Sequence, residues 1–290
     1  MNFYDELKYK AFNSGLRVNF FIALNVLIFL LISLITITEY LFTKKTPISD
    51  FLNEQLAVPT YLPNLLQQPW STFTYMFMHD GFFHILFNML WLFWIGSILE
   101  EFLNGKKVTF VYLMGGLSGA FIYVLSYNLL PAFAEQVVLS RAVGASASVM
   151  AIVVATATLL PNYTIGLMFL GPVKLKWIAL FYVIFDFLSI AGPNAGGHLA
   201  HLGGAIFGFF FIKSLSGGND WCKPFENFFK PTSRLKVVSK NERSVSNRNH
   251  NPNQSEIDAI LDKISQAGYE KLSQQEKEIL FSASSKNEEK

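Results

Sequence analysis

The chain contains a single cysteine, Cys222, among its 290 residues, so no disulfide can form within it. Charged residues are scarce as well: Asp, Glu, Lys and Arg make up 15% of the sequence, whereas an average soluble domain has roughly 25%. This scarcity excludes an ordinary soluble domain for most of the chain. The formal net charge of +2 says little about partners, because the charges are segregated along the chain, and we expect no nucleic-acid partner.

Long apolar runs take the place of the missing charge. Hydrophobic residues make up 51% of the sequence, mean hydropathy is +0.33, and the 29 phenylalanines are concentrated before residue 230. A helix that crosses a bilayer needs about 20 apolar residues, with a range of about 17–25. We therefore predict an all-α membrane protein with six membrane-spanning helices, at residues 18–41, 83–102, 108–130, 145–160, 175–190 and 197–215. The first run is too long for a signal peptide and is interpreted as a retained span.

The loops between these runs differ in their content of Lys and Arg, which predicts the orientation of the protein. With the N-terminus inside, the outer loops hold only Lys44, Lys45 and Arg141. The inner loops then hold most of the positive charge, at Lys8, Lys10, Arg17, Lys106, Lys107, Lys174 and Lys176 and in the basic stretch 213–248. Because positive residues favour the cytoplasmic side, we predict that both termini are cytoplasmic. The second, fourth and sixth runs then begin toward the outer face.

A serine opens the fourth run, within the sequence Gly144-Ala145-Ser146-Ala147. Backbone N–H groups in the first turn of a helix lack partners inside the helix, so those around Ser146 could stabilise an oxyanion on an attacked carbonyl. Gly144 would let the backbone or a substrate approach closely. Two alternatives stay open at this point. The small residues could simply pack helices together, or Ser148 could be the nucleophile, although it faces another side of the helix.

A histidine lies inside the sixth run, where an ionisable residue is costly and therefore suggests function. His201 is followed by Gly204 and Gly208, whose four-residue spacing permits close contact with a neighbouring helix. Such contact would bring His201 to Ser146, as general base to nucleophile. His198, one turn earlier, is interpreted as a solvated residue at the mouth of the span. We expect no zinc site on the two histidines, because no third ligand lies at ligand spacing.

The second run begins with two polar side chains, His84 and Asn88, four residues apart on one face of the helix. Both side chains can donate hydrogen bonds, so aimed at a carbonyl oxygen they would complete an oxyanion hole. The alternative is an interhelical hydrogen-bond site without a catalytic role. His79 precedes the span and is interpreted as structural.

These motifs, in this order on six predicted spans, resemble the rhomboid intramembrane serine proteases of the bacterial six-span type. The resemblance implies a six-transmembrane-helix rhomboid-like bundle in which Ser146 is the nucleophile and His201 the general base. It implies neither a metal nor a cofactor. It also implies an oxyanion hole formed by His84, Asn88 and the backbone of Ser146 and Ala145. The supporting residues that it implies are Gly144, Met150, Gly204 and Gly208.

Three positions depart from the family's pattern. The residue after the serine is Ala147 where the family usually has glycine, and we expect its methyl group to crowd the nucleophile and favour a small residue before the cut. Met150 stands where the family usually has an aromatic residue stacked on the catalytic histidine, and a thioether can still contact an imidazole. Trp70 is followed by Ser71, where the family usually has arginine. We expect this difference to affect the anchoring of the first outer loop more than the chemistry.

Two of the carboxylates in the predicted spans carry a prediction. Asp186 is in the fifth run with no obvious basic partner in the sequence, so we expect it to be protonated, in contact with water or hydrogen-bonded. The alternative is that Asp186 is a third catalytic residue, which the family pattern does not favour. Glu100, at the inner end of the second run, resembles the family's acidic residue at that place and is interpreted as structural.

The chain changes character after residue 215. We predict a cytoplasmic segment, a six-span protease core, a basic flexible linker and a helical hairpin, at residues 1–15, 16–215, 216–254 and 255–290. The linker could associate with anionic lipids. Capping-box patterns at Ser255–Asp258 and Ser273–Glu276 predict the starts of the two hairpin helices. The hairpin is too short for a large core, and we expect it to dock to a partner or to the inner face of the protease.

The predicted function is an intramembrane serine endopeptidase that cleaves transmembrane substrates near the outer face of the membrane. The resemblance implies single-span membrane proteins as substrates and a multi-pass protein of the bacterial inner (cell) membrane. The alternative is a catalytically impaired rhomboid-like protein that binds membrane clients, although both motif residues, Ser146 and His201, are present. A transporter or channel is a third class, which would show internal repeats or paired broken helices.

Overall fold

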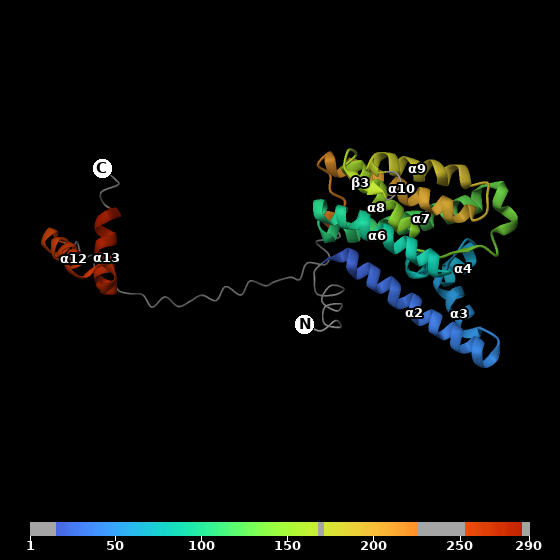
Figure 1. The fold of residues 1–290 in the computed structure, drawn as a ribbon, viewed down its shortest axis with the longest axis horizontal. Coiled ribbons are helices and arrows are strands. Elements are labelled where there is room, and N and C mark those ends of the chain that lie inside the picture. The colour runs from blue at the N-terminus through green and yellow to red at the C-terminus, as the bar shows by residue number, and fades with distance from the viewer. Residues whose placement is uncertain (1–15, 168–170, 225–252, 286–290) are drawn as a thin grey trace. The chain divides into compact units, whose positions relative to one another are not determined.

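The computed structural model describes residues 16–167, 171–224 and 253–285, and its contacts divide the chain into two compact units, Met1–Pro231 and Thr232–Lys290 (Figure 1). In the described part of the first unit, the long helices form a bundle with two short two-stranded sheets at its loops. The described part of the second unit is helical. The site positions predicted from the sequence all belong to the first unit.

A helix lies at each of the six predicted runs. These helices are α2 (Arg17–Thr43), α6 (Phe82–Leu103), α7 (Gly105–Leu129), α8 (Ser146–Leu159), α9 (Leu175–Ser189) and α10 (Ala195–Ser216). Among the described residues, α2, α6, α7 and α10 are long and apolar enough to cross a membrane. With 14 and 15 residues, α8 and α9 are about 21–23 Å long, shorter than a hydrocarbon core of about 30 Å. The mostly helical membrane-type fold is confirmed, and the six crossings remain a prediction.

Short elements connect the long helices. Between α2 and α6 the chain forms α3 (Pro47–Leu56), β1 (Val58–Pro59), α4 (Leu62–Gln67), α5 (Ser71–Thr74) and the 3-10 helix η2 (Tyr75–Phe77). Between α7 and α8 it forms the 3-10 helix η3 (Pro131–Gln136) and β2 (Arg141–Ala142), which pairs antiparallel with β1. Between α8 and α9, β3 (Thr164–Leu167) and β4 (Gly171–Lys174) form a second antiparallel pair.

The side chains of Trp70 and Arg141 hold the end of α3. The Trp70 indole Nε1 donates a hydrogen bond to the carbonyl oxygen of Gln55, at 2.9 Å. The Arg141 guanidinium donates to the carbonyl oxygen of Glu54, at 2.8 Å. An arginine of β2 therefore helps to hold this segment, although Trp70 is followed by serine.

Helix α8 is the central helix of the bundle. Every residue from Ala147 to Ala157 is buried, and the helix packs against α6, α7, α9 and α10. It begins just after Gly144, whose φ of +129° disfavours any residue with a side chain. It ends before Pro161, which disfavours a helical conformation in the residue before it. Because other helices surround α8, its backbone lies inside protein rather than in lipid, and the helix can be shorter than the hydrocarbon core.

Two glycines of α10 lie against the backbone of α8. A Cβ atom at Gly204 would collide with the carbonyl oxygen of Ala147, and one at Gly208 with the carbonyl oxygen of Ala151. The close helix contact that the four-residue glycine spacing predicted is confirmed. This contact fixes the relative position of the two helices that carry the predicted nucleophile and base.

Glu100, near the end of α6, caps the start of α2. Its carboxylate accepts hydrogen bonds from the backbone N–H groups of Arg17, at 2.7 Å, and Val18, at 3.0 Å. First-turn N–H groups have no partner inside their own helix, and the helix dipole favours a negative charge there. The structural role expected for Glu100 is confirmed.

Residues 219–222, which we placed in the flexible linker, pack against the helices of the first unit, to which they belong. Cys222 is fully buried, the ring of Trp221 lies 6.3 Å from that of Phe211, and Asp220 forms an ion pair with Lys107 at 3.0 Å. The predicted start of the linker at residue 216 is therefore too early, because side chains of this stretch find partners on the bundle. Residues 225–252 of the predicted linker lie outside the described residues.

In the second unit, helices α12 (Gln254–Ala267) and α13 (Gln274–Ser285) flank the 3-10 helix η4 (Tyr269–Lys271). The first capping box is formed by Asn253 and Glu256, two residues before the predicted one, because Asn253 also accepts a backbone N–H. The second lies at Ser273 and Glu276 as predicted. An ion pair from Lys263 to Glu276, at 2.7 Å, joins the two helices and, with the capping bonds, lowers the pKa of the Glu276 carboxyl to about 2.

Candidate active site

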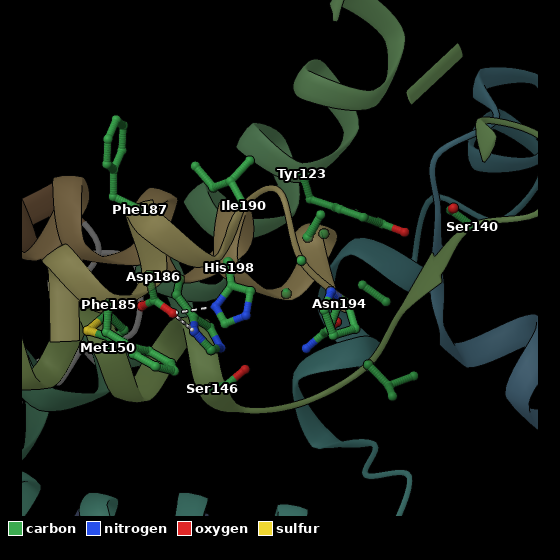
Figure 2. Close-up of a pocket in the computed structure, with 18 of the residues that line it drawn as sticks. Tyr123, Ser140, Ser146, Met150, Phe185, Asp186, Phe187, Ile190, Asn194 and His198 are labelled. Carbon is green, nitrogen blue, oxygen red and sulfur yellow. Dashed lines mark hydrogen bonds and ion pairs between the residues drawn. The ribbon is translucent and has the colours of Figure 1, made fainter. Parts of the chain in front are cut away.

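One cavity gathers the residues that the sequence predicted for the site. Its volume is about 1640 Å³, and side chains of α6, α8, α9 and α10 line it together with the loops before α8 and α10. Figure 2 shows Ser146 and Met150 of α8 beside Asp186 of α9 and His198 of α10. The predicted residues that line the cavity are Ser146, His201, His84, Asn88 and Met150. Three separate helices therefore contribute to a single site.

Ser146 is the first residue of α8, where the chain makes a close turn. The N–H of Gly144 donates to the carbonyl oxygen of Tyr75, at 2.9 Å. A Cβ atom at Gly144 would lie 2.8 Å from His84 Nε2 and 3.5 Å from Ser146 Oγ. The missing side chain thus lets the imidazole and the hydroxyl approach the same point. Among the described residues, no side chain caps the start of α8, so its first N–H groups are left to interact with a bound group.

Ser148, the alternative nucleophile, is fully buried away from the cavity. Its hydroxyl lies 3.9 Å from the sulfur of Met76, and a Cβ atom at Gly116 would lie 2.6 Å from it. A substrate carbonyl could not reach Oγ there without displacing α7. Of the two serines, Ser146 is the one that faces the cavity.

The expected crowding of the nucleophile by Ala147 is wrong. The side chain of Ala147 is buried, and a Cβ atom at Gly119 of α7 would lie 2.5 Å from its methyl group. The methyl group therefore fills space between α8 and α7, because the rotation of α8 turns this position away from the cavity. The small-residue preference that we derived from it loses its basis.

His84 and Asn88 lie on one face of α6, as predicted. The Asn88 amide nitrogen donates to the carbonyl oxygen of His84, at 2.8 Å. An amide nitrogen carries two hydrogens, so the second stays available to a ligand in the cavity. His79 lies edge-on to His84 with ring centroids 5.0 Å apart, and burial together with the nearby His84 lowers the pKa of His79 to about 3. A neutral, half-buried His79 that packs on His84 agrees with the structural role expected for it.

Of two expectations about α9 and α10, one is confirmed and one is wrong. Asp186 is hydrogen-bonded, one of the three states expected for it, although its partners were not evident from the sequence: its Oδ1 lies 2.9 Å from Nδ1 of His201 and 2.7 Å from Nδ1 of His198. His198 is not solvated at a mouth, since its side chain is 14% exposed and is held by this contact. The packing of α9 against α10 creates the pairing across 12 and 15 residues of sequence. A carboxylate in an apolar run needs a partner. This need was the feature of the sequence that could have predicted the contact of Asp186 with the histidines.

Ser146 and His201 share the cavity without a direct hydrogen bond between their side chains among the described residues. Catalytic hydrogen bonds are often long in a site without substrate and shorten when the substrate binds. The structure therefore places the Ser146 hydroxyl and the His201 imidazole at one cavity. We expect the hydrogen bond between them to form when a substrate binds.

The statement that no third metal ligand accompanies His198 and His201 is also corrected. Asp186 supplies one, and the ligand atoms of the three residues lie within 4.8 Å of one another. Ligand atoms around tetrahedral zinc are about 3.3 Å apart, given bond lengths of about 2.0–2.2 Å. The carboxylate oxygen is closer than that to both ring nitrogens, at 2.7 and 2.9 Å. The geometry is that of two hydrogen bonds to one oxygen.

Two family models match the chain: the Rhomboid domain over residues 66–217, and a family of unknown function (DUF6576) over residues 244–286. The chain is 30% identical over 163 residues to Rhomboid-related protein 1 of Caenorhabditis elegans, covering 52% of this chain and 41% of that protein. It is 30% identical over 140 residues to the mitochondrial presenilin-associated rhomboid-like protein A of Danio rerio, covering 47% and 35%. It is 34% identical over 67 residues to Rhomboid protease GlpG of Klebsiella pneumoniae, covering 23% and 24%. The matches span less than half the length of these relatives.

Proposed function

Because the chain belongs to the rhomboid family, we propose that it is an intramembrane serine endopeptidase with Ser146 as nucleophile and His201 as general base. The observation that carries the proposal is the cavity that both side chains line, from α8 and α10. A serine, a histidine and unpaired first-turn N–H groups around one cavity are the components of acyl transfer. A similar protein from Klebsiella pneumoniae is named a rhomboid protease.

The proposed reaction has an acylation half and a hydrolysis half. Nε2 of His201 takes the hydroxyl proton of Ser146 as Oγ bonds to the substrate carbonyl carbon. The tetrahedral intermediate collapses, and the imidazolium gives that proton to the leaving amine. Water then attacks the acyl-enzyme, with His201 again taking and returning a proton. In both halves the N–H groups of Ser146 and Ala145, with His84 and Asn88, would donate to the oxyanion.

The oxyanion role predicts a specific kinetic defect. His84→Ala and Asn88→Ala are each expected to lower kcat about 10²–10³-fold, because a donor aimed at the oxyanion stabilises the transition state more than the bound substrate. Labelling of Ser146 by a fluorophosphonate should weaken but stay detectable. Steady-state cleavage of a single-span reporter in liposomes measures the change.

The matched control for the amide is Asn128→Ala. Asn128 also donates to the carbonyl oxygen four residues earlier, at 2.9 Å, but it lies on α7 and is not among the described residues that line the cavity. Its replacement should leave kcat within about threefold of wild type, as expected for a residue outside the transition-state contacts. Unchanged turnover in both His84→Ala and Asn88→Ala would show that the pair serves helix packing alone.

The proposal includes the placement of the site in the membrane. It puts both termini in the cytoplasm, six spans in a bacterial inner (cell) membrane, and the cavity in the outer half of the bilayer. The distribution of Lys and Arg among the loops supports this orientation. The four helices long and apolar enough to cross a membrane support the membrane location.

The depth of the site predicts where a substrate is cut. A helical substrate has its carbonyl groups in internal hydrogen bonds, and hydrocarbon offers no other partners. The substrate must therefore unwind locally, which Gly or Pro makes easier. We expect cleavage of a single-span protein with an outer N-terminus, near the outer end of its span. Mass spectrometry of products from a panel of such reporters in liposomes tests this.

The control for that panel is a reporter whose span is polyleucine with the same flanks, which should be cleaved much more slowly. Cuts that cluster in the inner half of the spans, or equal cleavage of the polyleucine reporter, would contradict the proposed orientation and the unwinding step. No cleavage of any reporter, with Ser146 unlabelled by a fluorophosphonate, would favour the second candidate function.

That second candidate is a catalytically impaired protein that binds membrane clients. The lack of a direct Ser146–His201 hydrogen bond among the described residues is the observation in its favour. It predicts that single-span proteins bind wild type and Ser146→Ala equally and are recovered intact from both. The protease predicts recovery of intact substrate only from Ser146→Ala.

For the second unit we propose a helical hairpin that binds a protein partner and takes no part in catalysis. Its helix α12 has an apolar face on which Ile260 is buried. Leu261 of α12 and Phe281 of α13 remain exposed. The Lys263–Glu276 ion pair supports the hairpin arrangement. The basic stretch before it would associate with anionic lipids of the inner leaflet.

A further inference from the structure

The carboxylate of Asp186 lies between two histidines at the cavity. One oxygen, Oδ1, is 2.9 Å from Nδ1 of His201 and 2.7 Å from Nδ1 of His198. A dashed line in Figure 2 marks the contact between Asp186 and His198. The Asp186 side chain is only 3% exposed. Its second oxygen, Oδ2, is buried with no hydrogen-bond partner among the described residues. The two imidazoles are therefore the groups that the described structure offers to this carboxylate.

We propose that Asp186 is a positioning residue that holds His201 in the tautomer and orientation that a general base needs. The inference rests on the proposed function, in which His201 removes the proton from Ser146. It extends the two-residue site to a linked set, Ser146–His201–Asp186, in which Asp186 acts only through His201. His198 provides the carboxylate with its second hydrogen bond.

The hydrogen-bond capacity of each group fixes where the protons lie. An ionised carboxylate only accepts hydrogen bonds, and a neutral imidazole has one N–H and one bare nitrogen. A contact of 2.9 Å between Oδ1 and Nδ1 therefore places the proton of His201 on Nδ1. The bare nitrogen is then Nε2, which is the atom that can take a proton from Ser146. Without the carboxylate, both tautomers of His201 would be populated, and one of them is not a base at Nε2.

Burial explains why the contact would matter during the reaction. When His201 takes the proton it becomes positively charged, and a carboxylate at hydrogen-bond distance stabilises that charge. The attraction is stronger in a site of low dielectric than in water. A buried carboxylate without a partner would be unfavourable, so the same contact holds Asp186 in place. The hydrogen bond from His198 adds to this effect without reaching the nucleophile.

Asp186→Asn tests the role by kinetics in the full-length protein in liposomes. An amide N–H facing Nδ1 favours the wrong tautomer, so kcat should fall about 10²–10⁴-fold, while KM changes less than about threefold. Asp186→Glu retains a carboxylate and should recover part of the lost kcat. His198→Asn leaves the Asp186–His201 bond in place, so its kcat should fall less than that of Asp186→Asn.

A second measurement does not depend on any variant at Asp186. ¹⁵N NMR of histidine-labelled wild-type protein, with His201 assigned by its loss in His201→Asn, should show a protonated Nδ1 and a bare Nε2. A proton on Nε2, or full kcat in folded Asp186→Asn, would overturn the positioning role and leave the proposed function standing. If wild type neither cleaves reporters nor labels at Ser146, the proposed function fails instead, and the NMR spectrum still decides the tautomer.

Discussion

Ser146→Ala and His201→Ala are each expected to reduce cleavage of a single-span reporter by at least about 10³-fold, because the nucleophile and its base act as a unit. The double variant should be no slower than either single variant, since removal of one member already disables the other. Product formation by reconstituted protein, measured over hours, sets the residual rate. Circular dichroism and thermal unfolding confirm that each variant is folded.

Ser148→Ala is the matched control for this prediction. Its hydroxyl is buried against Met76, two positions along the same helix from the predicted nucleophile. Cleavage should stay within about threefold of wild type, as expected for a residue outside the reacting groups. Loss of cleavage in Ser148→Ala with retention in Ser146→Ala would reverse the assignment of the two serines.

Gly204→Ala is expected to weaken both the fold and the activity. The added Cβ would collide with the carbonyl oxygen of Ala147, which is backbone and cannot rotate away, so α10 must shift from α8. Overpacking of this kind destabilises a protein by typically about 1–3 kcal/mol. The shift also moves His201 relative to Ser146, and a displacement of about 1 Å can lower the rate about 10²-fold.

Thermal unfolding in detergent and kcat in liposomes measure the two effects. The control is Gly166→Ala, an identical change in β3 at a position where an added Cβ meets nothing within 4 Å. It should leave both quantities close to those of wild type. Wild-type unfolding and turnover in Gly204→Ala would mean that the α8–α10 contact does not set the geometry of the site.

The polar residues of the site could be predicted because each of them interrupts an apolar run. Ser146, His201, His84 and Asn88 lie in stretches where a polar side chain needs a reason, and the structure brings all four to one cavity. The helices could be predicted as well, since apolar runs of this length favour helices in a membrane. The glycine spacing after His201 predicted a close contact but not which carbonyl groups it would meet.

What could not be predicted depends on how the helices are rotated and paired. Asp186 meets His198 and His201 because α9 packs on α10, and no periodicity within one helix encodes that contact. The direction of the Ala147 methyl group depends on the rotation of α8 about its axis. Asn253 and Ser255 are both good capping residues, and local geometry decides between them.

Fluorophosphonate labelling of the reconstituted protein, followed by mass spectrometry of its peptides, tests the central claim most directly. The probe reacts covalently with an activated serine and needs no knowledge of the natural substrate. We predict one adduct, on Ser146, which is absent from Ser146→Ala and strongly reduced in folded His201→Ala. An adduct on Ser148, or labelling of Ser146 at an equal rate in His201→Ala, would contradict a site in which His201 activates Ser146.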